Sequence, residues 1–198
     1  MKILSLLLLL PLLAFSQNSK TYNDTIPAKE LNNEELQMKE YINSSYVNDS
    51  KKLLGVEFGN IVLEDINAEL FISENEKKII FYNFWSKSCA PCLEEIPMLN
   101  ALKKKYKNKV EFVAITFDDV EIIKKVEFNF RHFIVDKNEI YKLNFNSGFP
   151  ISFIISNGKI LYYKLGGTTS ESPFHNASTK QTFFKFCEII DNEISKLK

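Results

Sequence analysis

The chain has 198 residues, 45% of them hydrophobic, and its 25 Lys and Arg residues balance its 25 Asp and Glu residues. That is enough apolar material for one globular core, and the balanced charge gives no electrostatic reason to expect a nucleic acid or an anionic membrane as a partner. Three cysteines are too few for a disulfide-stapled mini-protein, and six glycines with six prolines are too few for a low-complexity or collagen-like chain.

Residues 1–16 predict a signal peptide. Lys2 precedes an apolar run over residues 3–15, which is shorter than the roughly 18 residues that a membrane span needs. The run ends in Ala14-Phe15-Ser16, with small residues where a signal peptidase cleaves; an uncleaved N-terminal anchor is the alternative. Cleavage leaves no predicted membrane span and places the protein in the periplasm or cell envelope, where disulfides form.

A polar arm and a single domain are predicted after the signal peptide. Residues 17–50 are rich in Asn, Ser, Glu and Lys and favour a loosely attached arm, whereas residues 51–198 are predicted to fold. Within them, the nearly continuous apolar run over 78–85 predicts a strand buried on both faces. A helix over 90–107 and a strand over 110–117 follow, so these elements predict a right-handed βαβ unit with parallel strands.

The rest of the domain predicts shorter elements. In chain order they are a helix over 118–130, a strand over 131–135 and a helix over 138–143. Two β-rich runs, 150–156 and 159–165, flank Asn157-Gly158, which is a two-residue hairpin signal. A closing helix begins near Ser178. This order predicts an α/β fold with one mixed central sheet flanked by helices.

Cys89 and Cys92 carry the chemical signal, because they lie where a buried strand ends and a helix begins. Thiols at i and i+3 in the first turn of a helix can close a disulfide. The first thiol lies beside free backbone N–H groups and the positive end of the helix dipole, which stabilise a thiolate. A thiolate attacks a substrate disulfide, and the second cysteine then resolves the mixed disulfide. The pair therefore predicts redox chemistry.

Other uses of the pair are less favoured. A purely structural bridge would close a loop of four residues, worth about 2 kcal/mol by the chain-entropy argument. A zinc site would need a second pair of ligands, and the remaining candidates, Cys187, His132 and His175, lack ligand spacing. Cys187 lies on the apolar stripe of the last helix and is predicted to pack in the core. Both histidines are predicted to be structural or surface residues, and no metal site is expected.

Residues 78–167 resemble the thioredoxin superfamily, and most of all its extracytoplasmic TlpA/ResA-like branch of thiol-disulfide oxidoreductases. The resemblance rests on three stretches: Asn83-Phe84-Trp85 leading into Cys89-Ala90-Pro91-Cys92, the acidic and proline-containing Leu93–Leu99, and Gly148-Phe149-Pro150 before a strand. It implies a thioredoxin-like fold, with an extra helix and strand inserted between residues 118 and 135, ahead of a cis-proline loop.

The resemblance also implies roles for individual residues. Cys89 would attack and Cys92 would resolve, and Pro91 would hold the dithiol turn. Pro150, in cis, would lie against the cysteines and leave the backbone of Phe149 to pair with an extended substrate strand.

Four further residues near the motif carry weaker expectations. Glu95 matches the acidic residue that lies beneath the cysteine pair in the ResA-like branch and influences its protonation; a solvated helix residue is the alternative. Trp85 is grouped with Phe149 and Pro91 as substrate-binding, with packing around the site as its alternative. Asp118 and Asp119 follow a predicted parallel strand, where a helix N-cap is favoured over a place at the site.

We therefore predict a thiol-disulfide oxidoreductase of the cell envelope that reduces disulfides in other proteins and needs no cofactor. The Ala-Pro between the cysteines resembles reducing members of the superfamily, which implies an upstream electron donor; apocytochrome c is a client that the family suggests. Two alternatives remain open. A Cu(I)-handling protein would add a distant histidine to the two thiolates, and a thiol peroxidase would need an arginine near its cysteine, where Arg131 is the sole arginine of the chain.

Overall fold

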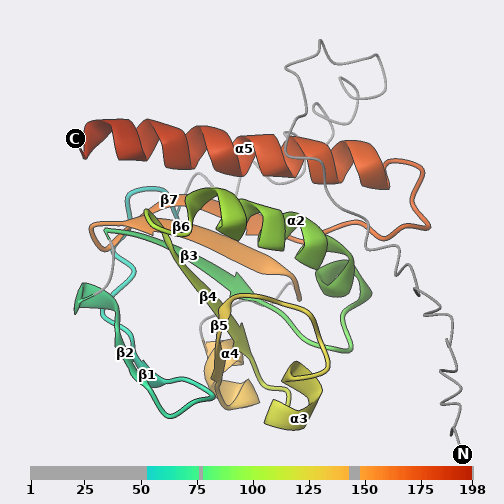
Figure 1. Cartoon of the computed structure of the whole chain (residues 1–198), viewed down its shortest axis with the longest axis horizontal. Helices are drawn as coiled ribbons and strands as arrows, with labels where there is room; N and C mark the ends of the chain where they lie inside the picture. The colour runs from blue at the N-terminus through green and yellow to red at the C-terminus, as the bar shows by residue number, and fades with distance from the viewer. Residues whose placement is uncertain (1–52, 76–77, 143–147, 198) are drawn as a thin grey trace, which may run out of the picture.

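The computed structural model describes residues 53–75, 78–142 and 148–197, so the predicted signal peptide and arm lie outside the described residues. A central five-stranded sheet has the order β5-β4-β3-β6-β7 (Figure 1). Its strands are β3 (Ile79–Phe84), β4 (Glu111–Thr116), β5 (Arg131–Ile134), β6 (Ile151–Ser156) and β7 (Lys159–Leu165). The first three are parallel, and β6 runs antiparallel to both β3 and β7. The predicted mixed sheet is confirmed.

Helices and a small hairpin cover the two faces of the sheet. The long helices α2 (Ala90–Tyr106) and α5 (His175–Lys196) lie on one face, and α4 (Lys137–Lys142) lies on the other (Figure 1). The hairpin of β1 (Val62–Glu64) and β2 (Leu70–Ile72), followed by the 3-10 turn Ser73–Asn75, also lies on the second face. None of the described helices combines the length and the apolar character that crossing a bilayer demands.

The alternation of side chains along β3 separates the core into two layers. Phe81 packs with Leu99 of α2 and Phe186 of α5, whereas its neighbours Ile80 and Tyr82 pack on the opposite face. Successive residues of a strand point to opposite faces, so Asn83 points to the same side as Phe81, toward α2. A polar side chain is thereby placed at the level where α2 begins, immediately before the chain leaves the sheet.

Two predicted boundaries were wrong. The helix predicted over 118–130 is limited to α3 (Val120–Ile123), and the chain from 124 to 130 is a turn followed by irregular structure. Aromatic packing explains this, because Phe128 and Phe130 are buried with ring centroids 4.5 Å apart. The last helix begins at His175 rather than near Ser178. The helix and strand expected between residues 118 and 135 are present as α3 and β5.

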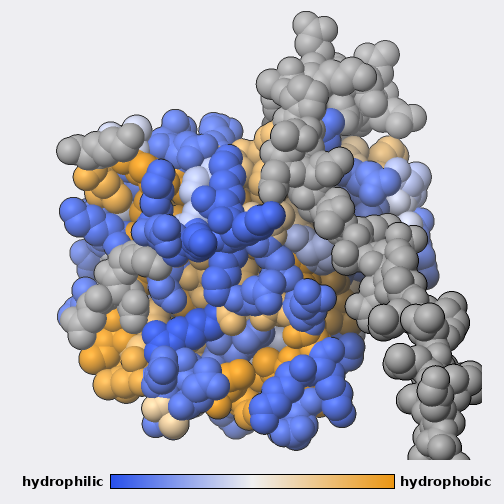
Figure 2. All heavy atoms as spheres, viewed as in Figure 1, coloured by the Kyte–Doolittle hydropathy of each residue, from blue (hydrophilic) through white to orange (hydrophobic). Residues whose placement is uncertain are grey.

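The β1–β2 hairpin was not predicted, and a partly buried ion pair links it to the sheet. Asp65, just after β1, lies 2.7 Å from Nε of Arg131 at the start of β5. Burial pushes the pKa of the Asp65 carboxyl upward. The hydrogen bonds from Arg131 and from backbone N–H groups outweigh that effect and hold the pKa below its usual value. Figure 2 shows hydrophobic surface over this hairpin, to which Val62 and Leu70 contribute exposed side chains.

Candidate active site

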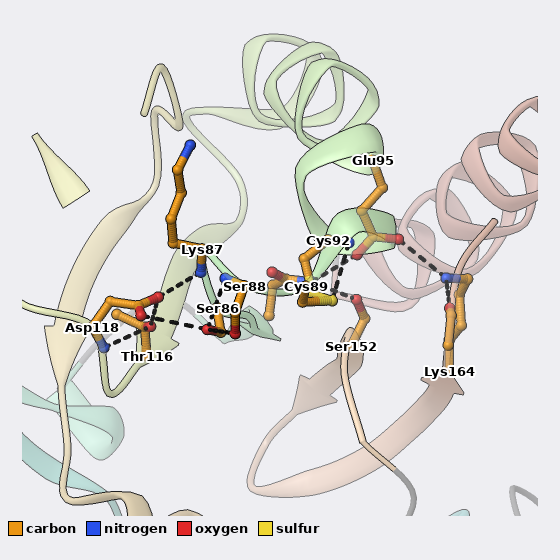
Figure 3. Close-up of a disulfide and its surroundings, with 12 residues drawn as sticks. Ser86, Lys87, Ser88, Cys89, Cys92, Glu95, Thr116, Asp118, Ser152 and Lys164 are labelled. Atoms are coloured by element: carbon orange, nitrogen blue, oxygen red, sulfur yellow. Dashed lines mark hydrogen bonds and ion pairs between the residues drawn. A yellow bond between two sulfur atoms is a disulfide. The ribbon is translucent and has the colours of Figure 1, made fainter. Parts of the chain in front are cut away.

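Cys89 and Cys92 form a disulfide at the start of α2, with Cα atoms 5.3 Å apart (Figure 3). Cys89 is the N-cap of the helix, and its sulfur accepts a hydrogen bond of 3.2 Å from the backbone N–H of Cys92. Cys89 is partly exposed, whereas Cys92 is only 1% exposed. The two sulfur atoms are thus unequal, because only that of Cys89 is open to another molecule and it sits at the positive end of the helix dipole.

Two prolines and a glycine lie close together near the start of α2. Pro91 lies in the first turn of α2, where its missing N–H leaves no helical hydrogen bond unmade. The peptide bond between Phe149 and Pro150 is cis, as the sequence predicted. A Cβ atom at Gly167, which follows β7, would lie 3.3 Å from Cγ of Pro150 and 3.3 Å from Cβ of Pro91. Gly167, which the sequence did not single out, therefore brings the strand β7 close to both prolines.

Glu95 lies one turn of α2 beyond Cys92 and is 6% exposed, so the alternative that it is a solvated residue is wrong. Its Oε1 accepts a hydrogen bond of 3.1 Å from the side-chain amide of Asn83 on β3. Its Oε2 lies 3.1 Å from Nζ of Lys164 on β7. The side-chain amide of Asn83 also donates to Oγ of Ser152 on β6 at 3.1 Å. The buried carboxylate of Glu95 is thus held by side chains of two strands, β3 and β7, and Ser152 of β6 binds Asn83 beside it.

Asn83 and Lys164, the two partners of Glu95, lie with Ser152 in one transverse row of the sheet. Asn83 is the register partner of Ser152, and Ser152 is the register partner of Lys164. Directly opposed residues of neighbouring strands share a face, so the three side chains line up beneath α2. Lys164 was missed by sequence reasoning because it lies 69 positions from Glu95 and nothing local to β7 marks it.

Asp118 borders the site, which corrects the prediction that it caps a helix. Its carboxylate accepts hydrogen bonds from the backbone N–H of Lys87 at 2.6 Å and from Oγ1 of Thr116 at 3.0 Å. Oγ of Ser86 lies 3.4 Å from its other oxygen. The N-cap of α3 is instead Asp119, whose side chain makes no capping hydrogen bond. As Figure 3 shows, Asp118 and Glu95 flank the disulfide from different sides.

Trp85 is 0% exposed, which does not agree with its place among the predicted substrate-binding residues. Its ring packs against those of Phe128 and His132, with centroids 5.6 and 5.8 Å away. A side chain without exposed surface cannot contact a substrate, so we assign Trp85 to packing. Phe149 is partly exposed, and its ring lies 5.9 Å from that of Phe117.

The remaining candidate ligands of the sequence are engaged elsewhere. Nε2 of His132 donates to the carbonyl of Phe128 at 2.8 Å, and Nδ1 of His175 lies 3.0 Å from the carbonyl of Thr168. Arg131, which the peroxidase alternative required, pairs with Asp65. Across the described parts of the chain, no cluster of three or more His, Cys, Asp or Glu side chains is placed to hold a metal ion.

Cys187 occupies the core, as predicted. It is a free cysteine on α5 and is 6% exposed. It packs in the same layer as Phe81 and Leu99, where a buried thiol acts as a small hydrophobic group.

Comparisons with known proteins identify relatives of this chain. Residues 53–180 match the Redoxin family. The thiol-disulfide oxidoreductase ResA of Bacillus thuringiensis subsp. konkukian is 31% identical over 134 residues, which cover 64% of this chain and 78% of that protein. ResA of Bacillus subtilis is 30% identical over 130 residues, or 62% of this chain and 72% of the relative.

Solved structures share the fold. The thioredoxin domain of a thiol-disulfide oxidoreductase from Bacteroides vulgatus has a TM-score of 0.52 at 18% identity and covers 67% of this chain and 96% of that one. A Chlorobium tepidum protein assigned as a thiol:disulfide interchange protein DsbE has a TM-score of 0.57 at 21% identity, with coverages of 69% and 97%. At these identities the likeness shows a thioredoxin-like fold. The match of residues 53–180 to the Redoxin family, together with the ResA relatives, establishes that the chain belongs to the Redoxin family and is a thiol-disulfide oxidoreductase.

Proposed function

We propose that this oxidoreductase reduces disulfides in other proteins of the cell envelope through the dithiol of Cys89 and Cys92. The observation that carries the proposal is the inequality of the two sulfur atoms. Cys89 is partly exposed at the N-terminus of α2, and Cys92 is 1% exposed behind it. An exposed thiolate at a helix N-terminus suits attack on a substrate, and a sheltered neighbour suits resolution.

The proposed reaction proceeds in two exchanges. The Cys89 thiolate attacks one sulfur of a protein disulfide, the substrate S–S bond breaks, and a mixed disulfide forms while the substrate releases one thiolate. Cys92 then loses its proton and attacks Sγ of Cys89, which releases the second substrate thiolate and closes the Cys89–Cys92 disulfide. Two electrons have passed to the substrate. We propose that the buried carboxylate of Glu95, one turn from Cys92, accepts the proton of that thiol.

We propose that the substrate segment docks at the cis-proline loop. Phe149 is partly exposed and precedes Pro150, which lies against Gly167 and, through it, against Pro91. An extended peptide that pairs with the backbone at Phe149 would bring its disulfide to the side where Cys89 is open. Proteins with disulfides are therefore the proposed substrates, and apocytochrome c remains a candidate client by resemblance alone.

The direction of electron flow requires a reductant upstream. The predicted signal peptide over residues 1–16 supports a location in the cell envelope, which is an oxidising compartment. A dithiol that reduces substrates there is left as a disulfide after each cycle, so a second dithiol protein must return two electrons to it. We propose such a donor as the second partner.

The equilibrium potential of the Cys89–Cys92 couple tests the direction. The full chain is equilibrated with dithiothreitol or glutathione buffers, and the fraction of reduced protein is measured by trapping free thiols. We expect a potential in the reducing range, near that of thioredoxin at about −270 mV. A value near that of strong oxidants, about −120 mV, would reverse the proposed direction.

A further inference from the structure

The ammonium group of Lys164 lies at a largely buried position, where packing alone would favour an apolar side chain. It lies on β7 with its side chain 17% exposed, and it faces Glu95, whose side chain is 8% exposed. Its Nζ contacts Oε2 of Glu95 at 3.1 Å and also donates to the carbonyl of Gly166. Long cationic side chains usually extend into water, so a lysine held inward on a carboxylate has a specific partner.

The contact with Glu95 is built into the sheet. Lys164 is opposed to Ser152 on β6, and Ser152 is opposed to Asn83 on β3, which binds the other oxygen of the carboxylate. Both carboxylate oxygens are therefore fixed, one by an amide and one by an ammonium group. Figure 3 shows Lys164 and Cys92 on either side of Glu95. Glu95 is therefore the residue through which Lys164 can influence the dithiol.

We propose that Lys164 is a positioning residue that keeps Glu95 ionised and aligned beneath the dithiol, and that it thereby sets how the reactivity of Cys89 depends on pH. The inference rests on the proposed role of Cys89 as the attacking thiol. Burial disfavours the charged form of an unpaired carboxylate, and a cation within about 4 Å favours it. Without Lys164, the carboxylate of Glu95 would be buried with only the neutral Asn83 as partner, an arrangement that disfavours its charged form.

The charge of Glu95 matters to Cys89 because like charges oppose one another. An ionised carboxylate near the dithiol disfavours a thiolate, so removing that charge with Glu95→Gln lowers the pH at which Cys89 ionises. If Lys164 is what keeps Glu95 ionised, the same substitution has no charge to remove once Lys164 is absent. The effect of one residue then depends on the presence of the other.

Other charged or titratable groups lie on the elements around the site, and all of them are the same in every variant of the test. On α2, Glu94 lies 3.9 Å from Nε2 of His175 at the start of α5. From the end of β4, Asp118 binds the backbone of Lys87 in the loop before the dithiol. His132 of β5 is buried under Trp85. Because no variant below changes these groups, their contributions cancel in a double-mutant cycle.

The test is a cycle of four full-length proteins: wild type, Glu95→Gln, Lys164→Met and the double variant. Each is reduced, and the alkylation rate of Cys89 is followed across pH, with the modified cysteine identified by mass spectrometry. We expect Glu95→Gln to lower the midpoint by about one pH unit in the wild-type background. In the Lys164→Met background we expect it to cause no resolvable shift. Equal shifts in the two backgrounds would overturn the proposal.

Matched variants separate charge from structure. Lys164→Arg retains a cation and should restore the shift caused by Glu95→Gln, whereas the neutral Lys164→Gln should abolish it as methionine does. Lys164→Gln also serves as the test variant if Lys164→Met does not fold. Lys159→Met changes an exposed lysine at the other end of β7 and should leave the midpoint unchanged.

Alkylation needs no substrate, so this inference and the proposed function can fail separately. If Glu95→Gln shifts the midpoint equally with and without Lys164, in a protein that still reduces protein disulfides through Cys89, only the role of Lys164 is refuted. A protein that shows the coupling but transfers no electrons to protein disulfides would refute the proposed function alone.

Discussion

The carboxylate of Asp118 accepts a hydrogen bond of 2.6 Å from the backbone N–H of Lys87. This contact joins the end of β4 to the loop that leads into the dithiol. The same carboxylate binds Thr116, which is buried within β4, so the loop is anchored to a rigid strand. Since Cys89 receives its position from this loop, Asp118 links the centre of the sheet to the attacking sulfur.

Asp118→Ala should therefore loosen the loop before the dithiol. Loss of hydrogen bonds to a charged acceptor should lower the free energy of unfolding by about 1–2 kcal/mol and slow disulfide exchange, because the start of α2 is less well fixed. Denaturant titration and an exchange assay measure the two effects. Asp119→Ala is the matched control, since the side chain of Asp119 is exposed and makes no capping hydrogen bond. Equal effects of the two substitutions would contradict the anchoring role.

The unequal burial of the two sulfur atoms predicts different outcomes for their serine variants. Cys89→Ser should abolish disulfide exchange, and Cys92→Ser should accumulate mixed disulfides with substrate, because attack still occurs and resolution does not. Non-reducing electrophoresis and mass spectrometry detect the trapped species. Cys187→Ala, in the core, should leave exchange unchanged. Exchange that survives Cys89→Ser, with no trapping by Cys92→Ser, would mean that the assigned roles are wrong.

Local patterns were sufficient for most of the fold. The apolar run of β3 and the Asn157-Gly158 turn depend on neighbouring residues, and both were predicted correctly. The helix after β4 was overextended because the pattern contains no sign that Phe128 and Phe130 pack together. The β1–β2 hairpin was missed because its strands are three residues long and depend on the distant pair of Asp65 with Arg131.

The site residues likewise fall into those that local sequence motifs predict and those that only tertiary packing brings into place. Cys89, Cys92 and Pro150 belong to contiguous motifs and were found from the sequence. Lys164 and Gly167 owe their places to the pairing of β7 with β6, which brings them to α2 and to the prolines. Such contacts arise from tertiary packing between segments far apart in the chain, and one sequence without its structure contains no local trace of them.

Gly167 predicts a steric test of the proline pair. In Gly167→Ala, the new methyl group would lie 3.3 Å from both Pro91 and Pro150, so the two prolines must move apart by a few tenths of an ångström. Because a displacement of 1 Å at a reacting centre costs about a hundredfold in rate, we expect exchange to slow by roughly threefold to tenfold. Glu171→Ala, exposed in the same loop, is the control. An unchanged rate would show that the spacing of the prolines is not critical.

The buried imidazole of His132 predicts how stability depends on pH. Burial lowers the pKa of His132, the charge of Lys103 lowers it further, and the hydrogen bond to the carbonyl of Phe128 opposes both. The folded protein therefore favours the neutral ring, whereas the unfolded chain takes up a proton near the ordinary value of about 6.5. The stabilisation is complete above that pH and is lost as the pH falls below it toward the lowered pKa of the folded state.

Replacing the imidazole should flatten this dependence. Wild type should lose stability between about pH 7.5 and about pH 5, and His132→Gln should lose less over the same interval, because it has no ring to protonate. Denaturant unfolding at a series of pH values gives the two slopes. The comparison concerns the slopes, so a general destabilisation by glutamine does not affect it. The steeper loss in wild type follows from burial of a titratable ring beneath Trp85, and parallel curves would show that His132 does not couple folding to pH in this range.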